Sequence, residues 1–329
     1  MVRYGIVGFG LHGVKRLMPG FAGASNSTAV ALSRRNLAQG RQDAEYFKIA
    51  HAFATTEELC ACPDVDVVFV SSPNALHLSD TLTALKHRKP VLCEKPMAMN
   101  AAEAEQMVNA ARKAGLLLGI AQCFRFEESI RRIREKVQAG EIGKIISIRI
   151  DFTFAGLNSP RSWLTDSKLA GGGPIGDVGV HTIDAMRYIL GSEPHSVMAM
   201  TSADEDAGTV ESSALLSLRF ANGVLGSSYV SYRSPYQSPI EIYGAEGIIR
   251  ANDGLNVDHP ITIETINGSD VRREEVTNYD TYSRQVDAFS AAFENREAFL
   301  VPAEEGLQNQ RILDACYRSA ESGREEKVI

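Results

Sequence analysis

The most restrictive feature of the sequence is the run Gly8-Phe-Gly10-Leu-His-Gly13, which directly follows the short apolar segment Arg3–Val7. Apolar residues at helical spacing come after it, from Val14 to Phe21. In this strand–turn–helix setting, glycines permit a tight turn and a close approach of pyrophosphate to the backbone, and the helix N-terminus attracts phosphate. The motif therefore predicts a dinucleotide-binding βαβ unit at the start of the chain.

The second expected strand, Ala29–Leu32, ends in Ser33-Arg34-Arg35-Asn36. An NAD-binding unit usually has Asp or Glu here to bind the ribose hydroxyls, and this sequence has neither. A hydroxyl followed by guanidinium groups suits a 2′-phosphate, because Arg makes charge-assisted, bidentate contacts to phosphate. We therefore expect NADP to be preferred over NAD, with Ser33 and Arg34 at the phosphate and Arg35 stacked on adenine. Two solvated arginines at a helix start are the alternative.

Strand and helix signals alternate up to residue 121, and the near-continuous apolar run Asp66–Val70 is typical of a central parallel strand. A polar turn, residues 71–77, follows this strand at the edge where the nicotinamide half of a cofactor would pass. We expect His77 to pack beside the cofactor rather than to act in catalysis. The pattern predicts a Rossmann-type doubly wound parallel sheet in a first domain, residues 1–122.

Another apolar strand, Val91–Cys93, is followed directly by Glu94-Lys95-Pro96. Pro96 prevents further strand pairing, and Asn100 with Glu103 resembles a capping box at the start of the next helix. A charged pair at the carboxyl end of a parallel strand lies where open α/β sheets bind ligands. The alternative is a surface Glu–Lys pair before a turn.

From residue 123 the pattern changes to a series of strands with alternating polar and apolar residues and few helices between them. It predicts a second, α+β domain, residues 123–329, with a large open and mostly antiparallel sheet that packs one face against a few helices. Two helices, residues 282–293 and 303–323, are expected to close the chain.

The chemistry of this half is concentrated in residues 163–188. A loop rich in glycine, Gly171–Gly176, leads into a helix whose positions i, i+4 and i+7 are Asp177, His181 and Asp184. These three side chains would share one helical face, and a histidine beside carboxylates suits proton transfer near neutral pH. A zinc site on this helix is a weaker alternative because no further ligand is apparent, and we expect no metal.

Composition limits the other function classes. The 329 residues have a net charge of −7 and a pI near 5.6, which argues against nucleic acid or an anionic membrane surface as the partner. No apolar run approaches the length of a membrane span, and the first strand begins too early for a signal peptide. The five cysteines follow no framework spacing, and Cys60-Ala-Cys62 is too tight for a usual metal knuckle. We expect reduced thiols and a cytoplasmic protein.

Taken together, the glycine motif, Glu94-Lys95-Pro96, Trp163, Ala170-Gly-Gly-Gly173 and Asp177-x-x-x-His181 resemble the glucose-fructose oxidoreductase / inositol dehydrogenase (Gfo/Idh/MocA) family over nearly the whole chain. The resemblance implies NAD(P)-dependent dehydrogenases of sugars and cyclic polyols, in particular the NADP-dependent anhydrosugar reductases and sugar dehydrogenases. It also implies a C-terminal sheet that pairs subunits into homodimers or homotetramers.

Carried over by position, Lys95 would bind the reacting oxygen, Asp177 would complete the site, and His181 would be its acid/base. Trp163 would join these three at the substrate. The same resemblance implies a set of residues that bind the cofactor: Gly8, Phe9, Gly10, Leu11, His12, Ser33, Arg34, Ser72, Pro73, Asn74, His77, Glu94, Lys95, Gln122, Trp163 and Tyr282. Many relatives have Arg where this chain has Leu164. Either Arg161 replaces that guanidinium or the pocket differs.

The sequence thus predicts an NADP(H)-dependent oxidoreductase acting on a secondary alcohol or ketone of a sugar, anhydrosugar or cyclic polyol. One rival is a non-catalytic sensor of the same fold, but such a protein could lose Lys95 or His181, and both are present. The other is a reductase of dihydrodiols or non-sugar carbonyls, which the motifs also allow.

Overall fold

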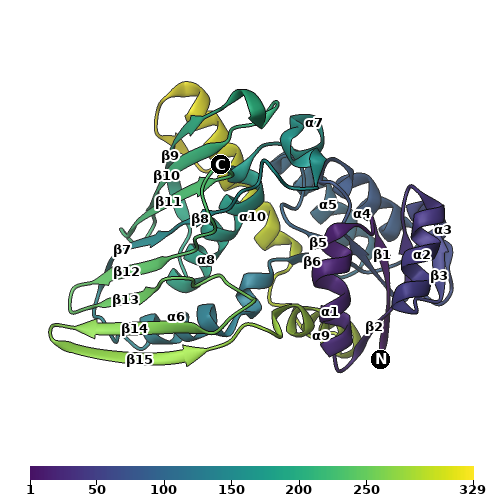
Figure 1. Cartoon of the computed structure of the whole chain (residues 1–329), viewed down its shortest axis with the longest axis horizontal. Helices are drawn as coiled ribbons and strands as arrows, with labels where there is room; N and C mark the ends of the chain where they lie inside the picture. The colour runs from purple at the N-terminus through teal and green to yellow at the C-terminus, as the bar shows by residue number, and fades with distance from the viewer. The chain divides into compact units, whose positions relative to one another are not determined.

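The computed structural model describes residues 1–329, and the chain forms two compact units (Figure 1). Unit 1 consists of Met1–Cys123 and Asp280–Gln310, and unit 2 of Phe124–Tyr279 and Arg311–Ile329. The expected first domain, residues 1–122, thus accounts for the first segment of unit 1 but not for its return segment. Local patterns do not show that return, because it depends on long-range contacts such as the bond from the Ile120 amide to the Val301 carbonyl, 3.0 Å.

Unit 1 is built on a six-stranded sheet with the order β3-β2-β1-β4-β5-β6, in which every pair is parallel. This confirms the expected doubly wound sheet. Its strands are β1 (Val2–Val7), β2 (Ser27–Ser33), β3 (His51–Phe53), β4 (Val67–Val70), β5 (Val91–Glu94) and β6 (Leu118–Ala121). Its helical segments are η1 (Gly13–Leu17), α1 (Met18–Gly23), α2 (Leu37–Phe47), α3 (Thr56–Ala61), η2 (Asn74–Leu76), α4 (His77–Lys86), α5 (Ala101–Ala114) and α9 (Thr281–Asn295).

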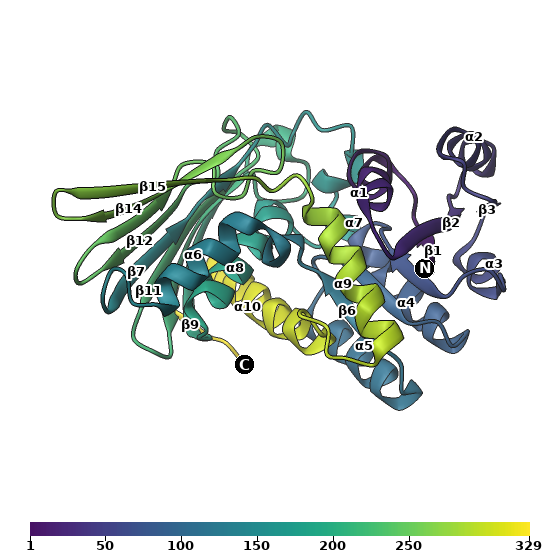
Figure 2. The same cartoon turned by 90° about the horizontal axis from the view of Figure 1, so that it is seen from below.

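The strand order reverses direction between β1 and β4, which fixes where a ligand can bind. The chain runs outward from β1 through β2 to β3 and then crosses to β4. Because such crossovers are right-handed, the helices on the two sides of this reversal cover opposite faces of the sheet. Helix α9 lies against α1, as Figure 2 shows. The carboxyl ends of β1 and β4 therefore flank the position where doubly wound sheets bind nucleotides.

Helix starts in unit 1 follow the capping residues in the sequence. Thr55 and Glu58 form a reciprocal capping box at α3. At α5 the Asn100 side chain accepts from the Glu103 amide as expected, but the Glu103 carboxylate accepts from the Met99 amide instead of completing the box. Only half of the expected capping box therefore forms at α5.

Unit 2 contains a ten-stranded sheet with the order β15-β14-β13-β12-β7-β11-β10-β9-β16, and β8 pairs with β11. Its pairs are antiparallel except those of β11 with β7 and β8, which confirms the expected mostly antiparallel sheet. The strands are β7 (Ile145–Ile150), β8 (Phe152–Thr153), β9 (Pro194–Ser202), β10 (Ser213–Phe220), β11 (Leu225–Ser231), β12 (Ile240–Gly244), β13 (Ile248–Ala251), β14 (Ile261–Asn267), β15 (Asp270–Val276) and β16 (Glu326–Lys327).

Helices cover one face of this sheet and leave the other uncovered (Figure 2). In β10, Ala214 and Leu216 are buried, whereas Leu215 between them and its register partner Met200 on β9 are exposed. The alternation follows from the period of two along a strand with one face packed on a core. The remaining helical segments of the chain are η3 (Cys123–Phe126), α6 (Glu128–Gln138), η4 (Ser162–Thr165), α7 (Ser167–Ala170), η5 (Ile175–Gly179), α8 (Val180–Leu190), η6 (Glu205–Ala207) and α10 (Ala303–Ser322).

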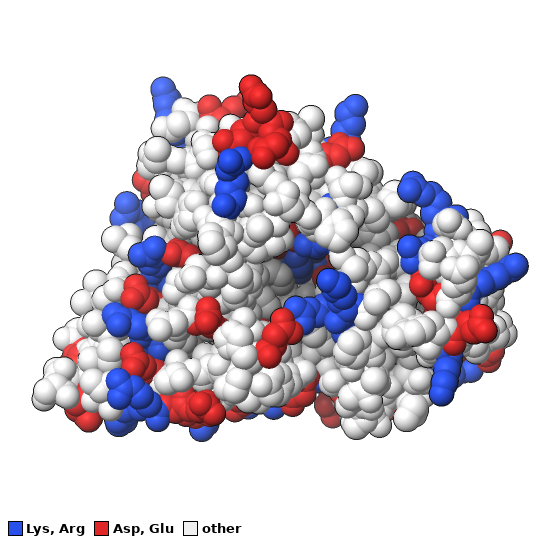
Figure 3. Space-filling model, in the orientation of Figure 1, with Lys and Arg blue, Asp and Glu red and all other residues white.

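Charged side chains are dispersed over the surface in view in Figure 3, where blue and red alternate over the strands of unit 2. Cross-strand ion pairs occur in this sheet, for example between Arg250 on β13 and Glu241 on β12, 3.2 Å apart. None of the helices is both long and apolar enough to cross a membrane.

Unit 2 also contains a buried ion pair between α8 and the segment before α6. Arg125 donates from Nε and Nη2 to the two carboxylate oxygens of Asp184, at 2.9 and 2.7 Å. The side chains are 6% and 1% exposed, and a second guanidinium, that of Arg187, lies 3.6 Å from Asp184. A buried charge that loses its partner is strongly destabilising, so this pair should be essential to the packing of α8.

We expect Asp184→Ala to lower the free energy of unfolding by roughly 3–5 kcal/mol, because it leaves the buried guanidinium of Arg125 without its carboxylate. Urea unfolding followed by circular dichroism measures this loss. Arg131→Ala is the matched control, since Arg131 is 45% exposed and pairs with Glu128 on the surface of α6. Its effect should stay below about 1 kcal/mol. Equal effects of the two substitutions would contradict the assignment of Asp184 as a core residue.

Candidate active site

The glycine loop after β1 is packed closely against the loop after β4. Gly8 has φ +74°, and a Cβ there would lie 2.4 Å from the Ser72 Cα. Only glycine fits this position, both for its backbone conformation and for the space available. Because these positions carry no side chain, a pyrophosphate can approach the backbone of the glycine loop directly, as the motif predicts.

Within this loop, Phe9 belongs to the hydrophobic core. It is 1% exposed, its ring lies edge-on to Phe47, and its amide donates to the Ser33 carbonyl at 2.9 Å. Phe9 was expected among the residues that bind the cofactor, and the structure places its side chain inside unit 1. Leu11 and Gly10 are half-buried. The helix that follows begins with the π-helical turn η1 instead of a regular α-helix.

The end of β2 presents the two residues expected at a 2′-phosphate. Ser33 is buried at 2% exposure, and the Arg34 amide donates to the Phe53 carbonyl at 3.1 Å. The Arg34 guanidinium forms an ion pair with Asp43 of α2 and remains one-third exposed, while Arg35 is exposed. Asp43 was not identified from the sequence, because its link to Arg34 depends on how α2 packs. It fixes the guanidinium while leaving part of it accessible.

Three of the expected residues meet near the end of β5. Glu94 Oε1 lies within hydrogen-bond distance of His12 Nε2, at 2.9 Å, and the His12 ring lies 5.9 Å from the ring of Tyr282. Burial of Glu94 opposes ionisation, but His12, Lys95 and His77 together hold the pKa of its carboxyl below the usual value. The ionised carboxylate thus accepts from His12 and links the glycine loop to the Glu94-Lys95 segment.

His77 connects the loops after β4 and β5. It is fully buried, with Nδ1 2.9 Å from the Pro96 carbonyl oxygen and Nε2 2.8 Å from the Ser72 carbonyl oxygen. Burial lowers the pKa of His77, although both carbonyls and Glu94 counteract that effect. Because the ring is enclosed by protein, the structure assigns His77 a packing role, and Ser72 is further fixed by its Oγ bond to Asp80 at 2.6 Å.

Gln122 directly follows β6 at the same edge of the sheet. It is 1% exposed, and its side-chain oxygen has no hydrogen-bond partner within the protein. A buried acceptor without a donor is costly unless another group supplies one. Pro73 is half-buried and Asn74 is buried on the loop after β4. The glycine loop and the unsatisfied oxygen of Gln122 both fit a bound dinucleotide at this edge.

In unit 2, Asp177 lies on the π-helical turn η5 and not on the regular helix that the spacing predicted. Its Oδ2 accepts from the Tyr232 hydroxyl at 3.2 Å, and Arg161 Nη2 lies 3.7 Å away. Burial, and secondarily the Asp177 charge, raises the pKa of Tyr232, so this phenol remains a donor. Such π-helical turns often occur at functional sites because they reorient side chains.

His181, one turn further along, is surrounded by aromatic rings. It is 6% exposed, stacks on Phe124 with centroids 4.2 Å apart, and lies 6.2 Å from the Phe152 ring. Stacking fixes the plane of the imidazole. The sequence did not identify Phe124, Phe152 or Tyr232, because aromatic residues in strands and helix starts are most often core residues.

The other residues expected near the helix have separate roles. The carboxylate of Asp184 forms the buried ion pair with Arg125, so it stabilises the core of unit 2. Trp163 is half-buried on η4, and Leu164 beside it is buried at 1% exposure. Arg161, one of the two alternatives for the guanidinium that Leu164 replaces, is the residue that faces Asp177.

Unit 1 thus holds Lys95 and the expected cofactor residues other than Trp163, and unit 2 holds Trp163, Asp177 and His181. Chemically, the first set fits a nucleotide at the carboxyl edge of a parallel sheet and an ammonium next to it. The second offers a carboxylate with two donors and an imidazole fixed by an aromatic ring, which suits proton transfer.

Two families of known domains match the chain. Residues 2–122 match the oxidoreductase family with an NAD-binding Rossmann fold, and residues 130–250 match the GFO/IDH/MocA C-terminal domain. The chain is 32% identical to D-xylose 1-dehydrogenase (NADP(+)) 2 of Haloferax volcanii, over 97% of this chain and 98% of that protein. It is 28% identical to 1,5-anhydro-D-fructose reductase of Ensifer adhaerens, over 100% and 99%.

Among solved structures, aldose-aldose oxidoreductase from Caulobacter crescentus, complexed with glycerol, superposes with a TM-score of 0.92 at 28% identity and covers 99% of both chains. These relatives are named as dehydrogenases, reductases or oxidoreductases of sugars. The Rossmann match lies in the amino-terminal part of the chain, and the match to the C-terminal domain follows it. The chain therefore belongs to the GFO/IDH/MocA family of oxidoreductases, and its amino-terminal domain is that family's NAD-binding Rossmann fold.

Proposed function

We propose that the protein is an NADP(H)-dependent oxidoreductase that interconverts a secondary alcohol and a ketone of a sugar, anhydrosugar or cyclic polyol. The main support is the pair Asp177 and His181, a carboxylate and an imidazole that are nearly buried and fixed by neighbouring side chains. The names of the relatives above support the substrate class. All five cysteines are free thiols, which suits a reducing compartment such as the cytoplasm.

In this proposal each residue has one task. The bound nicotinamide supplies or accepts the hydride. The Lys95 ammonium binds the reacting oxygen and stabilises negative charge that develops on it. His181 Nε2 or Nδ1 removes the hydroxyl proton during oxidation and returns it during reduction. Asp177, oriented by Tyr232 and Arg161, binds substrate hydroxyls beside that oxygen.

The cofactor preference rests on the end of β2. No carboxylate occupies the position that binds ribose hydroxyls in NAD-specific units, and Asp43 fixes the Arg34 guanidinium there. A phosphate on the 2′-oxygen gains a charge-assisted contact from Arg34, whereas NAD has no group for it. One relative, the xylose dehydrogenase, is named for NADP(+).

We also propose that the uncovered face of the unit 2 sheet pairs two copies of the chain. Leu215 on β10 is in register with Met200 on β9 and Tyr229 on β11, so these side chains form one row across three strands. Met200 is 65% and Leu215 56% exposed, and the neighbouring Met198 and Leu225 are exposed as well. An exposed apolar patch of this kind is typical of subunit interfaces.

The first test replaces the ammonium. Lys95→Met should leave NADPH affinity nearly unchanged and lower turnover at least about 100-fold, because charge on the reacting oxygen loses its stabilisation. NADPH fluorescence titration and a spectrophotometric screen of sugars, inositols, anhydroketoses and dihydrodiols measure the two quantities. Lys86→Met, which removes an exposed ammonium from α4, is the control and should behave as wild type. Normal turnover of Lys95→Met would remove Lys95 from the mechanism, and tight NADPH binding without turnover by the unaltered protein would favour a sensor.

The cofactor proposal predicts an asymmetric loss. Arg34→Ala should weaken NADPH binding by roughly 1–3 kcal/mol and leave NADH binding little changed, since the lost contact is to the 2′-phosphate. Arg35→Ala is the comparison, because stacking on adenine would affect both cofactors alike. Isothermal titration calorimetry with each cofactor gives the values. Equal losses for NADPH and NADH in Arg34→Ala would refute the assignment.

The assembly proposal predicts that charge on the uncovered sheet face separates the subunits. The double substitution Met200→Glu and Leu215→Glu should convert the assembly to monomers, because it buries carboxylates without partners. Size-exclusion chromatography with light scattering measures the mass. Tyr46→Glu, at a 78% exposed position of unit 1, should leave the mass unchanged. A monomeric wild type, or an assembly unaffected by the double substitution, would contradict the proposal.

A further inference from the structure

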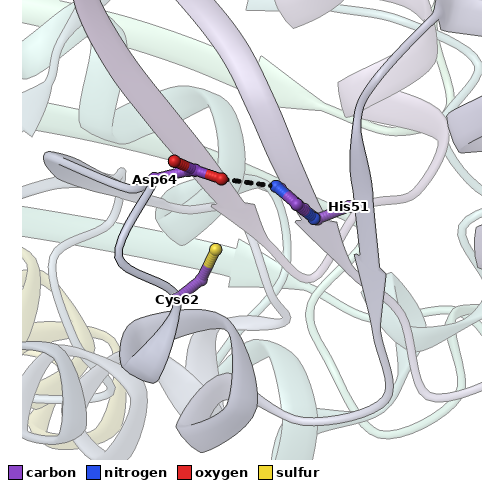
Figure 4. Close-up of side chains that lie close together, drawn as sticks. All are labelled: His51, Cys62 and Asp64. Atoms are coloured by element: carbon purple, nitrogen blue, oxygen red, sulfur yellow. Dashed lines mark hydrogen bonds and ion pairs between the residues drawn. The ribbon is translucent and has the colours of Figure 1, made fainter.

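Three side chains of different chemistry meet at the edge of the unit 1 sheet where its parallel strands begin (Figure 4). His51 is the first residue of β3, Cys62 ends α3, and Asp64 lies in the turn before β4. His51 Nε2 lies 2.9 Å from Asp64 Oδ2, and one potential ligand atom from each of the three residues lies within 4.8 Å of the other two. In Figure 4 the Cys62 sulfur points toward the other two side chains.

These are the ligand types that zinc prefers. Imidazole nitrogen, thiolate sulfur and carboxylate oxygen bind Zn²⁺ at about 2.0–2.3 Å, so neighbouring ligand atoms in a tetrahedral site are about 3.3–3.8 Å apart. To reach that geometry the Cys62 sulfur has to approach the other two atoms by at most about 1.5 Å, and His51 Nε2 and Asp64 Oδ2, which are 2.9 Å apart, have to separate by about 0.4 Å. Rotations of exposed side chains are sufficient for such a shift, because His51 and Asp64 are 37% and 51% exposed.

The neighbouring charges leave the cluster suited to a cation. Arg3 donates from Nε and Nη2 to the two oxygens of Asp66, at 3.0 and 2.8 Å, so Asp66 balances most of its charge. Arg3 Nη1 contacts only Oδ1 of Asp64, at 3.0 Å, which leaves Oδ2 directed at His51. This second contact orients the carboxylate in the way that outer residues orient metal ligands. The Lys89 ammonium donates to the Val65 carbonyl at 2.6 Å and to the Cys62 carbonyl at 3.5 Å.

An ion can reach the cluster from solvent, and the cluster is separate from the nucleotide edge of the sheet. Cys62 is 7% exposed, while the two other ligands are open to solvent, so an ion can enter from their side and water can complete its coordination. The glycine loop follows Val7 at the carboxyl end of β1, whereas Arg3 beside the cluster lies at its start. Because the sheet is parallel, the cluster and the nucleotide loops lie at opposite edges of unit 1.

We propose that His51, Cys62 and Asp64 bind one Zn²⁺ ion, with water as the fourth ligand. Binding replaces the proton between His51 and Asp64 and the thiol proton of Cys62, and both protons leave to solvent. The ion links the start of β3 to the turn before β4 on either side of α3. It therefore stabilises unit 1, because it binds the folded arrangement and not the unfolded chain.

Cobalt substitution tests the ligand set directly. One equivalent of Co²⁺ added to the metal-free protein should produce a thiolate-to-cobalt charge-transfer absorption in the near ultraviolet, and Zn²⁺ should displace it. Cys62→Ser should abolish this band, and His51→Ala, which keeps the thiol, should weaken Co²⁺ binding at least about tenfold. Zn²⁺ should raise the Tm of the wild type and of neither variant.

His87→Ala is the matched control. His87 Nε2 lies 2.8 Å from Glu57 Oε1 in the same unit, so it is an equivalent histidine–carboxylate pair outside the proposed site. This variant should keep the band and the Zn²⁺-dependent Tm shift. Circular dichroism of the metal-free variants shows whether each is folded. Absence of the band in the wild type, its persistence in Cys62→Ser, or an unchanged Co²⁺ affinity in His51→Ala would each overturn the proposal.

Discussion

The contact between Gly8 and Ser72 determines the geometry of the nucleotide edge of unit 1. A side chain at Gly8 would overlap the Ser72 backbone, so the loops after β1 and β4 can approach only because this position is glycine. The Ser72 carbonyl in turn lies at the buried ring of His77, whose other nitrogen faces the Pro96 carbonyl. One steric constraint and one imidazole thus connect the ends of three neighbouring strands, β1, β4 and β5.

This connection explains why residues far apart in sequence take part in one arrangement. Glu94 lies at the end of β5, and its carboxylate faces His12 of the glycine loop. The pKa of this buried carboxyl stays below its usual value because the interactions with His12, Lys95 and His77 outweigh the effect of burial. A shift of the β5 end would separate this pair, so the position of Lys95, the next residue, is linked to that of the glycine loop.

In unit 2, neighbouring side chains hold polar residues in place beside an apolar core. Asp177 is fixed by Tyr232 and Arg161, and His181 by stacking on Phe124. The three partners come from β11's end, from the start of η4 and from η3. Low solvent exposure strengthens the electrostatic interactions of such groups. The large sheet supplies the rigid surface on which this arrangement is built.

The class of fold, most of its strands and helices, and the family could be predicted from the sequence, because they depend on local periodicity, glycine spacing and short motifs. The sequence left two alternatives for the arginine missing at Leu164, a substitute guanidinium from Arg161 or a different pocket. Only the tertiary structure decided that residues 280–310 return to unit 1, that Asp184 pairs with Arg125, and that Asp43 fixes Arg34. It alone brought Cys62 next to His51 and Asp64. The physical reason is that a side chain's partner is set by packing between segments distant in sequence, and periodicity along the chain contains no information about that packing.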